Sequence, residues 1–454
     1  MDILNRFANS FLFWAAWIII PVIMEIIPSL GSVVILIKKT LFPVKYETPI
    51  LQPEISLIIP VYNSQETLEE CIRSISESDY PNSRIRIFLV NNQGQDDSFH
   101  VFTKCQKQFP DLMMQWLNAK QGKSKALNLA LFNSDGKYII HIDSDGLLEK
   151  SALTNMVNKF EGDSSIECMT GVILTDPAQV QAYPFGPKRL LRKMEFMEYA
   201  QAFLAGRNYA SEMNAIYTLS GAFSAFRKSA VLKSQLYSTD TICEDTQITF
   251  QMKYLQKKKV SICENAIFFV DPIEDLNKLY TQRQRWQRGS LEVSALFLKK
   301  ELKAYKMFRN ENVRTLMYDH TFAFPRMIWY LALICLLCMN YSFKLVMYAT
   351  LFLFFLYVLV GFFYYLSTVG FLKGFDDIRK YYRRQWYVVP LLPFFNLFVF
   401  FIRFAGVINS INTDSAWKVK NFTEERRAAA GVIRHDMTGV FRVLEKIRKF
   451  VNVE

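Results

Sequence analysis

The sequence predicts an α/β protein with a mostly parallel sheet, held at a membrane by apolar helices. From about residue 54, short β-branched runs alternate with helical patterns, as expected for parallel strands covered by helices on both faces. Polar clusters follow three of the predicted strands. Long apolar blocks with almost no charge stand before and after this region, and several have the length of a spanning helix.

The first apolar block covers residues 11–37 and carries a single charge. A spanning helix needs ~20 residues, whereas a cleaved signal peptide has a shorter apolar core and a small-residue cleavage site. Lys38 and Lys39 follow at once, so the positive-inside rule places the next segment in the cytosol. Pro21 and Pro28 leave two interpretations open: a kinked spanning helix, or one that partly lies in the interface.

The first half of the α/β region contains four predicted strands and two predicted helices. Runs of β-branched and apolar residues indicate buried strands, and apolar residues at helical spacing indicate the helices between them. The strands are expected at 55–61, 85–90, 112–117 and 137–143, and the helices at 65–76 and 123–132.

Polar side chains stand at the carboxyl ends of the first, second and fourth of these strands. Ligands of open α/β sheets bind beyond the carboxyl ends of the strands, so we expect these side chains to lie around one crevice. The three clusters are Pro60-Val61-Tyr62-Asn63, Asn91-Asn92 and Asp143-Ser144-Asp145.

Asp143 and Asp145 allow two interpretations. Turns favour aspartate, so the pair fits an ordinary turn after a strand. Carboxylates are also ligands for Mg²⁺ or Mn²⁺, with phosphate oxygens completing the shell. Such a metal neutralises charge that develops on a nucleotide diphosphate leaving group. The neighbouring polar clusters favour the metal site.

The segment around Lys123 resembles a phosphate-binding loop only in part. The motif requires a glycine five residues before Gly122, and none stands there. Lys123 at the start of a helix can still meet a phosphate, because its charge and the helix dipole act together. The alternative is an ordinary exposed lysine.

Two further motifs carry most of the functional interpretation. Glu244-Asp245 opens a helical pattern, where the pair fits either a helix N-terminus or a general base beside the metal. Gln282, Arg285 and Trp286 lie within about one and a half helical turns. Arginine binds phosphate bidentately, and tryptophan either stacks on a sugar or anchors at the membrane interface. Together the motifs predict a transferase.

Several segments between these motifs leave alternatives open. The predicted helix at 188–212 begins with basic residues and fits a solvated face or an interfacial or substrate-channel element. Gly221, after Ser220, suggests close backbone approach. Residues 275–300 are predicted to form an amphipathic helix on the membrane.

Three apolar blocks follow toward the C-terminus. Residues 327–343 and 345–372 contain no charge and predict a hairpin of two spanning helices, followed by a basic cytosolic loop. Residues 387–402 number only 16 and include two prolines, which fits a span or a re-entrant segment. We favour the re-entrant segment, because a span would place the basic tail 411–454 outside.

The composition excludes several classes of protein. The net charge of +12 fits an anionic substrate or anionic lipid better than nucleic acid, because basic residues cluster beside apolar segments. Seven scattered cysteines indicate a reduced, cytosol-facing compartment. Gly-x-Ser-x-Gly and Gly-x-Gly-x-x-Gly motifs are both absent, so hydrolase and dehydrogenase interpretations lack their core residues.

The order of motifs resembles that of the membrane-embedded family 2 glycosyltransferases, which include hyaluronan, poly-N-acetylglucosamine and cellulose synthases. The resemblance covers about residues 10–420 and implies a GT-A fold and inverting transfer from a UDP-sugar. The motifs that carry it are Ile58-Ile59-Pro60-Val61-Tyr62-Asn63, Asp143-x-Asp145, Glu244-Asp245 and Gln282-x-x-Arg285-Trp286.

The resemblance implies a role for each motif. On the donor side it places Pro60, Tyr62 and Asn91 around the nucleotide, Lys123 at the diphosphate, and Asp143 and Asp145 at UDP and the metal, Mg²⁺ or Mn²⁺. On the acceptor side it makes Asp245 the catalytic base beside Glu244, and it places Ser220 and Gly221 near the acceptor. It places Gln282, Arg285 and Trp286 at the pyrophosphate and at the acceptor end. Trp417 and Lys418 would belong to a gating loop.

Two positions depart from the family pattern. Asn91-Asn92 stands where the family usually has Asp-Asp, so a hydrogen bond to a uracil edge is kept but the charge is lost. Cys243 stands where threonine is common before Glu-Asp.

The main hypothesis is a processive enzyme that extends a β-linked polysaccharide from a UDP-sugar at the cell membrane. It predicts a multi-pass protein with a cytosolic catalytic domain, and membrane lipids but no nucleic acid as partners. One alternative is single transfer to a lipid carrier or membrane lipid, and another is a catalytically silent regulator that binds nucleotide sugar. The expected domains are a transmembrane helix at 1–40, the catalytic domain at 41–274, interface helices at 275–320, a transmembrane hairpin at 321–372, a basic loop with a re-entrant or transmembrane segment at 373–410, and a gating-loop segment with a basic tail at 411–454.

Overall fold

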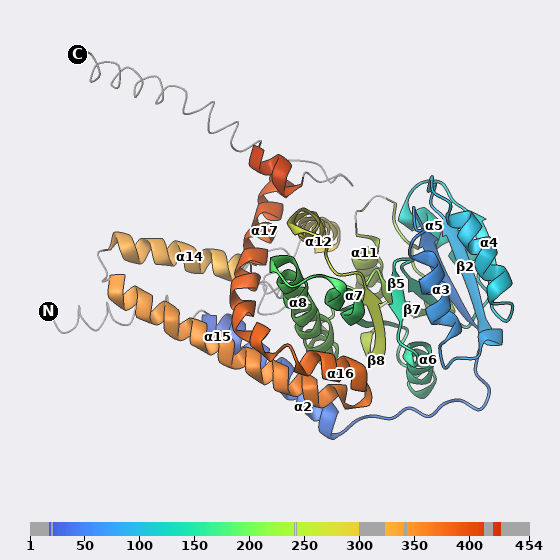
Figure 1. Ribbon diagram of the computed structural model, residues 1–454, viewed down its shortest axis with the longest axis horizontal. Helices are drawn as coiled ribbons and strands as arrows, with labels where there is room; N and C mark the ends of the chain where they lie inside the picture. Colours follow the sequence, from blue (N-terminus) through green and yellow to red (C-terminus); the bar gives the residue numbers. More distant parts are fainter. Residues whose placement is uncertain are drawn as a thin grey trace, which may run out of the picture.

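The computed structural model describes residues 18–19, 21–239, 241, 243–298, 323–339, 343–412 and 421–427 of the chain. The sheet and its helices lie on one side of the view in Figure 1, and the apolar helices lie on the other. Parts of the predicted terminal domains, the interface segment 299–320 and the gating-loop residues Trp417 and Lys418 lie outside the described residues.

An eight-stranded sheet forms the centre of the α/β region, in the order β3-β2-β1-β4-β7-β6-β8-β5. The four strands predicted from the sequence pair in parallel, but β7 pairs antiparallel with β4 and β6, and β5 pairs antiparallel with β8. The sheet is therefore mixed, with a parallel first half. The strands are β1 (Ile55–Val61), β2 (Ile85–Asn91), β3 (Met113–Asn118), β4 (Tyr138–Ile142), β5 (Gly146–Leu148), β6 (Cys168–Thr175), β7 (Phe223–Arg227) and β8 (Val260–Val270).

The central strands are covered on both faces. Every residue of β4 and β6 is buried, as expected for strands that lie between two layers of helices. The second predicted helix is confirmed almost to its ends, whereas the first starts at Leu68, because residues 65–67 form a turn. The helices of this half are α3 (Leu68–Ser76), α4 (Ser98–Gln108), α5 (Lys123–Asn133) and α6 (Ala152–Gly162).

A second group of helices comes from the second half of the α/β region, and its members labelled in Figure 1 lie between the sheet and the apolar helices. The predicted helix at 188–212 is one continuous helical segment whose middle turns widen into a π-helix, η4. This group consists of α7 (Pro177–Ala182), α8 (Pro187–Tyr199), η4 (Ala200–Gly206), α9 (Arg207–Glu212), α10 (Lys228–Val231), α11 (Glu244–Phe250), η5 (Gln251–Leu255) and α12 (Leu276–Leu298).

Two stretches of the described chain are long and apolar enough to cross a membrane, Val346–Gly374 and Trp386–Asn409. The second is longer than the 16 residues counted from the sequence, because its helix continues through the buried Arg403. Its length therefore fits a span, whereas the sequence favoured a re-entrant segment. The apolar part contains η2 (Val22–Ile26), α2 (Ile27–Leu41), α14 (Ala323–Cys338), α15 (Phe343–Phe371), η8 (Trp386–Leu391) and α17 (Leu392–Asn412), with the polar helix α16 (Asp376–Arg383) between α15 and η8.

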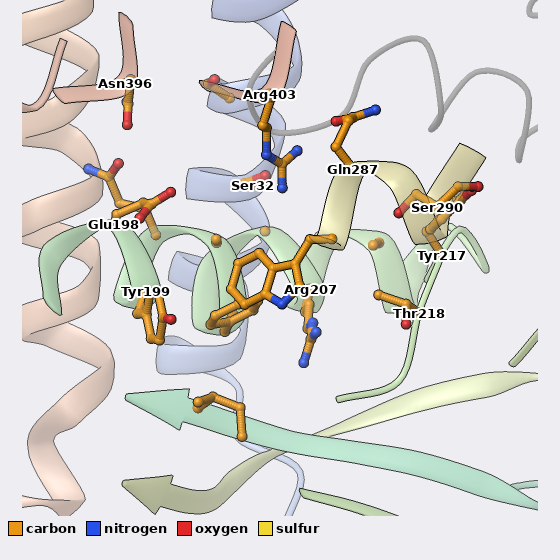
Figure 2. A pocket seen from close by; sticks show the side chains of 18 of the residues that line it. Ser32, Glu198, Tyr199, Arg207, Tyr217, Thr218, Gln287, Ser290, Asn396 and Arg403 are labelled. Atoms are coloured by element: carbon orange, nitrogen blue, oxygen red, sulfur yellow. The ribbon is translucent and has the colours of Figure 1, made fainter. Parts of the chain in front are cut away.

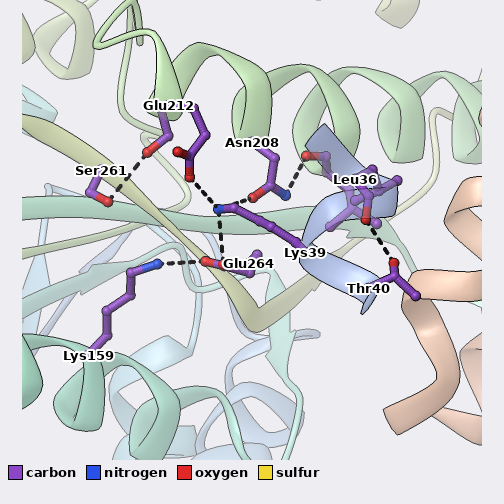
Figure 3. Close-up of polar contacts among 10 residues, drawn as sticks. Leu36, Lys39, Thr40, Lys159, Asn208, Glu212, Ser261 and Glu264 are labelled. Atoms are coloured by element: carbon purple, nitrogen blue, oxygen red, sulfur yellow. Dashed lines mark hydrogen bonds and ion pairs between the residues drawn. The ribbon is translucent and has the colours of Figure 1, made fainter. Parts of the chain in front are cut away.

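A cluster of ion pairs joins the end of α2 to the sheet (Figure 3). The two carboxylate oxygens of Glu264 in β8 accept from Lys39 Nζ at 3.0 Å and from Lys159 Nζ at 2.6 Å. Burial acts to raise the pKa of Glu264, but the two lysine charges outweigh it and hold the pKa at about 2. Glu264 is therefore an anion at neutral pH, placed between the N-terminal helix and the α/β region.

The low pKa of Glu264 predicts how stability depends on pH. A carboxylate whose pKa is depressed on folding stabilises the fold above its ordinary pKa, and this contribution, on the order of 3 kcal/mol, is lost as the pH falls toward 2. We expect Glu264→Gln to melt well below the wild type at pH 7, because it removes the ion pair of the buried Lys159 and leaves Lys39 with Glu212 as its remaining carboxylate. The difference should narrow between pH 4.5 and 3 in thermal unfolding of the detergent-solubilised protein. Glu274→Gln, which removes an exposed ion pair, is the control and should follow the wild type. Parallel curves for wild type and Glu264→Gln would contradict this assignment.

Candidate active site

A cavity of about 1120 Å³ lies between the sheet and the apolar helices. Ten residues singled out from the sequence line it, so the structure brings most of the predicted site together. Figure 2 shows further side chains that enter the same cavity from separate elements, among them Arg207 and Arg403. The ten residues are Lys123, Asp143, Asp145, Ser220, Gly221, Glu244, Asp245, Gln282, Arg285 and Trp286.

Lys123 lies at the centre of the acidic part of the cavity. Its Nζ donates to Asp143 Oδ1 at 2.6 Å and to the carbonyl of Gly221 at 3.3 Å, and lies 3.6 Å from Glu244 Oε1. Burial acts to lower the pKa of Lys123, but the charges of Asp143 and Glu244 outweigh it and raise the pKa above its ordinary value. Lys123 is therefore a fixed cation, not the ordinary exposed lysine of the alternative interpretation.

Asp143 and Asp145 follow strand β4 and lie in the same cavity. Burial, and to a smaller extent the negative charge of Asp143, raises the pKa of Asp145 to about 6. A cation beside Asp145 would counteract both effects and favour the ionised carboxylate. The described residues hold no group of three or more His, Cys, Asp or Glu side chains placed to bind a metal. Two carboxylates with open space beside them nevertheless fit Mg²⁺ or Mn²⁺, which take the rest of their shell from phosphates and water.

Glu244 and Asp245 form the first turn of α11, one residue after the cap position at Cys243. The backbone N–H groups of Gly221 and Thr246 donate to the Asp245 carboxylate at 3.1 and 2.6 Å. These contacts hold the Asp245 carboxylate at the cavity wall. Burial raises the pKa of Glu244 despite the nearby Lys123 charge. The position of Asp245 in the cavity wall suits a base that receives a proton from a bound ligand.

Helix α12 brings Gln282, Arg285 and Trp286 to the cavity. It packs closely on the start of α11, since a Cβ atom at Gly289 would lie 2.0 Å from Cys243 Sγ. Any larger residue at position 289 would require Cys243 to move. Trp286 is half-buried in the cavity wall, with its ring 6.1 Å from that of Phe203. Its position therefore differs from that of an exposed membrane anchor.

Of the two arginines in the Gln282–Trp286 stretch, which the sequence predicts to bind phosphate, Arg283 does not line the cavity and packs against the Trp286 ring. The Arg283 guanidinium is buried, lies 2.5 Å from Glu198 Oε2 and covers the Trp286 ring at 4.4 Å. A buried ion pair on α8 and α12 thus fixes the indole. Its partner is 85 positions away in the chain, so local spacing held no signal for it.

The family 2 glycosyl transferase model matches residues 56–233. Residues 56–233 are a family 2 glycosyltransferase domain. For this part of the chain, the match confirms the family predicted from the motif order. The match includes Lys123, Asp143, Asp145, Ser220 and Gly221, whereas α11 and α12 follow it.

Known relatives extend this similarity beyond the domain. The chain is 26% identical over 239 residues to poly-β-1,6-N-acetyl-D-glucosamine synthases of Staphylococcus aureus strain COL and of Staphylococcus epidermidis. The matched region covers 53% of this chain, and the chain spans about half the length (55%) of these curated relatives.

Among solved structures, the mannosyltransferase PcManGT from Pyrobaculum calidifontis, in complex with GDP-Man and Mn²⁺, superposes with a TM-score of 0.53. The match has 17% identity and covers 84% of this chain and 98% of that chain. At this identity the similarity concerns the fold, and it confirms the predicted GT-A type of sheet.

Three residues of the glycosyltransferase domain that were predicted to surround the nucleotide of the sugar donor do not line the cavity. They are Pro60, Tyr62 and Asn91. They stand at the same sheet edge as Asp143, since Val61 pairs with Asn91 and β1 pairs in parallel with β4. The neighbouring Asn92 Oδ1 accepts from the Gly122 backbone N–H at 2.6 Å. This asparagine thus fixes the residue before Lys123.

Proposed function

We propose that the protein is an inverting, metal-dependent glycosyltransferase that extends a β-linked polysaccharide processively from a UDP-sugar. The observation that carries this proposal is the lining of one cavity. It includes Lys123 and Asp245 and, from the apolar helices α15 and α17, Tyr357 and Asn396. A site that shares its cavity with apolar helices suits a product that stays bound while it grows and leaves by a passage between these helices.

The donor side follows from the charges around Lys123. A UDP-sugar placed at the end of β4 would bring its diphosphate to Lys123 and to Arg285, whose guanidinium suits phosphate oxygens. Asp143 and Asp145 would hold Mg²⁺ or Mn²⁺, which supplies charge neutralisation for the departing diphosphate. The mannosyltransferase relative in fold was solved with Mn²⁺, which supports a divalent metal.

On the acceptor side, Asp245 would accept the proton of the acceptor hydroxyl. The hydroxyl oxygen then attacks the anomeric carbon of the donor from the face opposite the diphosphate. The new glycosidic bond forms as the bond to the diphosphate oxygen breaks, and UDP leaves with that electron pair. Single displacement inverts the anomeric configuration. Trp286 offers a flat apolar face on which an acceptor sugar can stack beside this base.

The orientation in the membrane rests on charge and helix length. Two described stretches are apolar enough to span, and Lys38 and Lys39 end the N-terminal helix. With positive charges on the cytosolic side, the glycosyltransferase domain faces the cytosol of a multi-pass protein at the cell membrane. The polysaccharide would leave through the passage between α15 and α17.

The names of the relatives suggest the donor to test first. Two of them are poly-β-1,6-N-acetyl-D-glucosamine synthases, so we propose UDP-N-acetylglucosamine as donor and a β-linked N-acetylglucosamine polymer as product.

This function is tested with membranes that contain the full-length protein and labelled UDP-N-acetylglucosamine. We expect products of many sugars even in the first minutes, because a processive enzyme completes one chain before it starts another. Size-exclusion chromatography of the labelled product measures this. A distribution that starts at single additions and lengthens uniformly with time would contradict processivity.

A second candidate function is transfer of one sugar to a lipid-linked acceptor. It is favoured by the membrane end of the cavity, where Leu353, Phe354 and Leu397 form an apolar wall. A labelled product that partitions into organic solvent and carries one sugar would support it. A silent nucleotide-sugar regulator, the third possibility, predicts neither product nor UDP release under any of these conditions.

A further inference from the structure

Arg207 lies in the wall of the cavity at the start of helix α9, and no motif of the sequence pointed to it (Figure 2). Its NH1 donates to Thr170 Oγ1 at 3.3 Å, and its guanidinium covers the Phe203 ring at 4.5 Å. Within the described residues these are its hydrogen bond and its ring contact. A guanidinium has five N–H donors, so most of those of Arg207 are left for a ligand in the cavity.

A short chain of hydrogen bonds places Arg207 next to the proposed base. Thr170 Oγ1 also accepts from the Ser220 backbone N–H at 3.1 Å, and the adjacent Gly221 N–H donates to Asp245 Oδ2 at 3.1 Å. Phe203, under the guanidinium, touches Trp286. The cation, the carboxylate and the indole thus line one part of the cavity.

The electrostatics of Arg207 also suit a ligand. Burial lowers the pKa of Arg207 to about 10, and the negative charge of Asp245 partly opposes this. The group remains charged at neutral pH but has lost much of its water. Oxygen atoms of a sugar, whether hydroxyl or acyl, would replace the lost hydrogen bonds.

We propose that Arg207 binds the acceptor sugar beside Asp245 and that Lys39 positions Arg207 by holding helix α9. This inference rests on the proposed glycosyl transfer and adds to it an acceptor contact from α9 and a role for the N-terminal helix.

The link between Lys39 and α9 passes through Asn208, the residue after Arg207 (Figure 3). Lys39 Nζ donates to Asn208 Oδ1 at 2.8 Å, and Asn208, fully buried, donates from Nδ2 to the Leu204 carbonyl at 2.8 Å. Lys39 also lies 3.4 Å from Glu212 at the other end of α9. Both ends of this short helix are therefore tied to one ammonium group.

Close packing of α2 on α9 supports the same role. A Cβ atom at Gly31 would lie 2.8 Å from the ring of Tyr209, which lines the cavity. The N-terminal helix thus sets the position of the cavity wall at two places.

The matched control for Lys39 is Lys159. Each lysine pairs with Glu264, but in the described residues Lys159 has no hydrogen bond or ion pair with α9. Replacing either with methionine leaves Glu264 one partner, so a general loss of stability is similar in the two variants. Only Lys39→Met releases Asn208.

The test measures sugar addition by the full-length protein in detergent, with a β-1,6-linked N-acetylglucosamine trisaccharide as acceptor and UDP-N-acetylglucosamine as donor. We expect Arg207→Gln to raise the acceptor KM about tenfold or more with little change in the donor KM, as loss of a charge-assisted hydrogen bond predicts. Arg207→Lys, which keeps the charge but not the planar fork, should lie between.

Lys39→Met should raise the acceptor KM severalfold, Lys39→Arg should restore it, and Lys159→Met should leave it unchanged. Equal acceptor KM values for wild type, Arg207→Gln and Arg207→Lys would overturn the contact. Equal effects of Lys39→Met and Lys159→Met would overturn the positioning role. If the wild type itself adds no sugar from any UDP-sugar, the proposed function fails, and not the acceptor contact. An unchanged donor KM shows that a variant is folded.

Discussion

Asp245→Asn is expected to lower the rate of sugar transfer about a thousandfold while UDP-sugar binding stays within a factor of a few. A positioned general base contributes roughly 10²–10⁴ in rate, and an amide cannot take the acceptor proton. Asparagine has the same size, and its oxygen can still accept from the Gly221 N–H. Initial rates with labelled donor, together with calorimetric titration of the donor, separate the two effects.

Glu244→Gln is the matched control for this prediction, since the two carboxylates are adjacent. Burial raises the pKa of Glu244, and its nearest cation is Lys123 at 3.6 Å. We expect a smaller loss of rate, arising from a displaced Lys123. Undiminished transfer by Asp245→Asn, or an equal loss in both variants, would refute the assignment of Asp245 as base.

Asp145→Asn is expected to lower transfer at least a hundredfold, and a chelator should do the same to the wild type. A metal at the leaving diphosphate contributes several kcal/mol, and each 1.4 kcal/mol changes the rate tenfold. Adding Mg²⁺ or Mn²⁺ should restore the chelated wild type and identify the better ion, whereas the variant should require far more metal. The measurement is the rate as a function of metal concentration.

The control for the metal prediction is Asp176→Asn, at the cap of α7, outside the cavity. It should keep the metal dependence of the wild type. Full activity in the presence of excess chelator would overturn the metal role and leave Lys123 and Arg285 to neutralise the diphosphate.

The first half of the sheet was predictable from the sequence because its signals are local. Strand β1 has the predicted boundaries. Each end of β2, β3 and β4 lies within one residue of its predicted position. The second half was not predicted, because β7 enters the sheet antiparallel to β4 from residues 81 or more positions later. Such pairing depends on tertiary contacts that hydrophobic periodicity does not encode.

The candidate site likewise contains residues that local sequence signals identified and residues that they did not. Asp143, Asp145 and Asp245 stand at recognisable places, a strand end and a helix start, and the cavity brings them together. Arg207 was missed because nothing in its neighbourhood distinguishes it from other basic helix residues. The length of the apolar segment at 387–402, counted up to Arg403, fitted a span or a re-entrant segment, and the basic tail favoured the re-entrant segment. The helix continues through Arg403, since a buried arginine can lie inside a helix when it has partners.

The cavity described above takes its walls from both ends of the chain, with Glu25 on one side and Asn396 on another. Because apolar residues of α15 and α17 form part of its lining, we expect apolar inhibitors that partition into the bilayer to bind in this cavity without competing with the nucleotide. Screening for such compounds calls for the intact protein in lipid, because an excised catalytic fragment lacks half of the chamber.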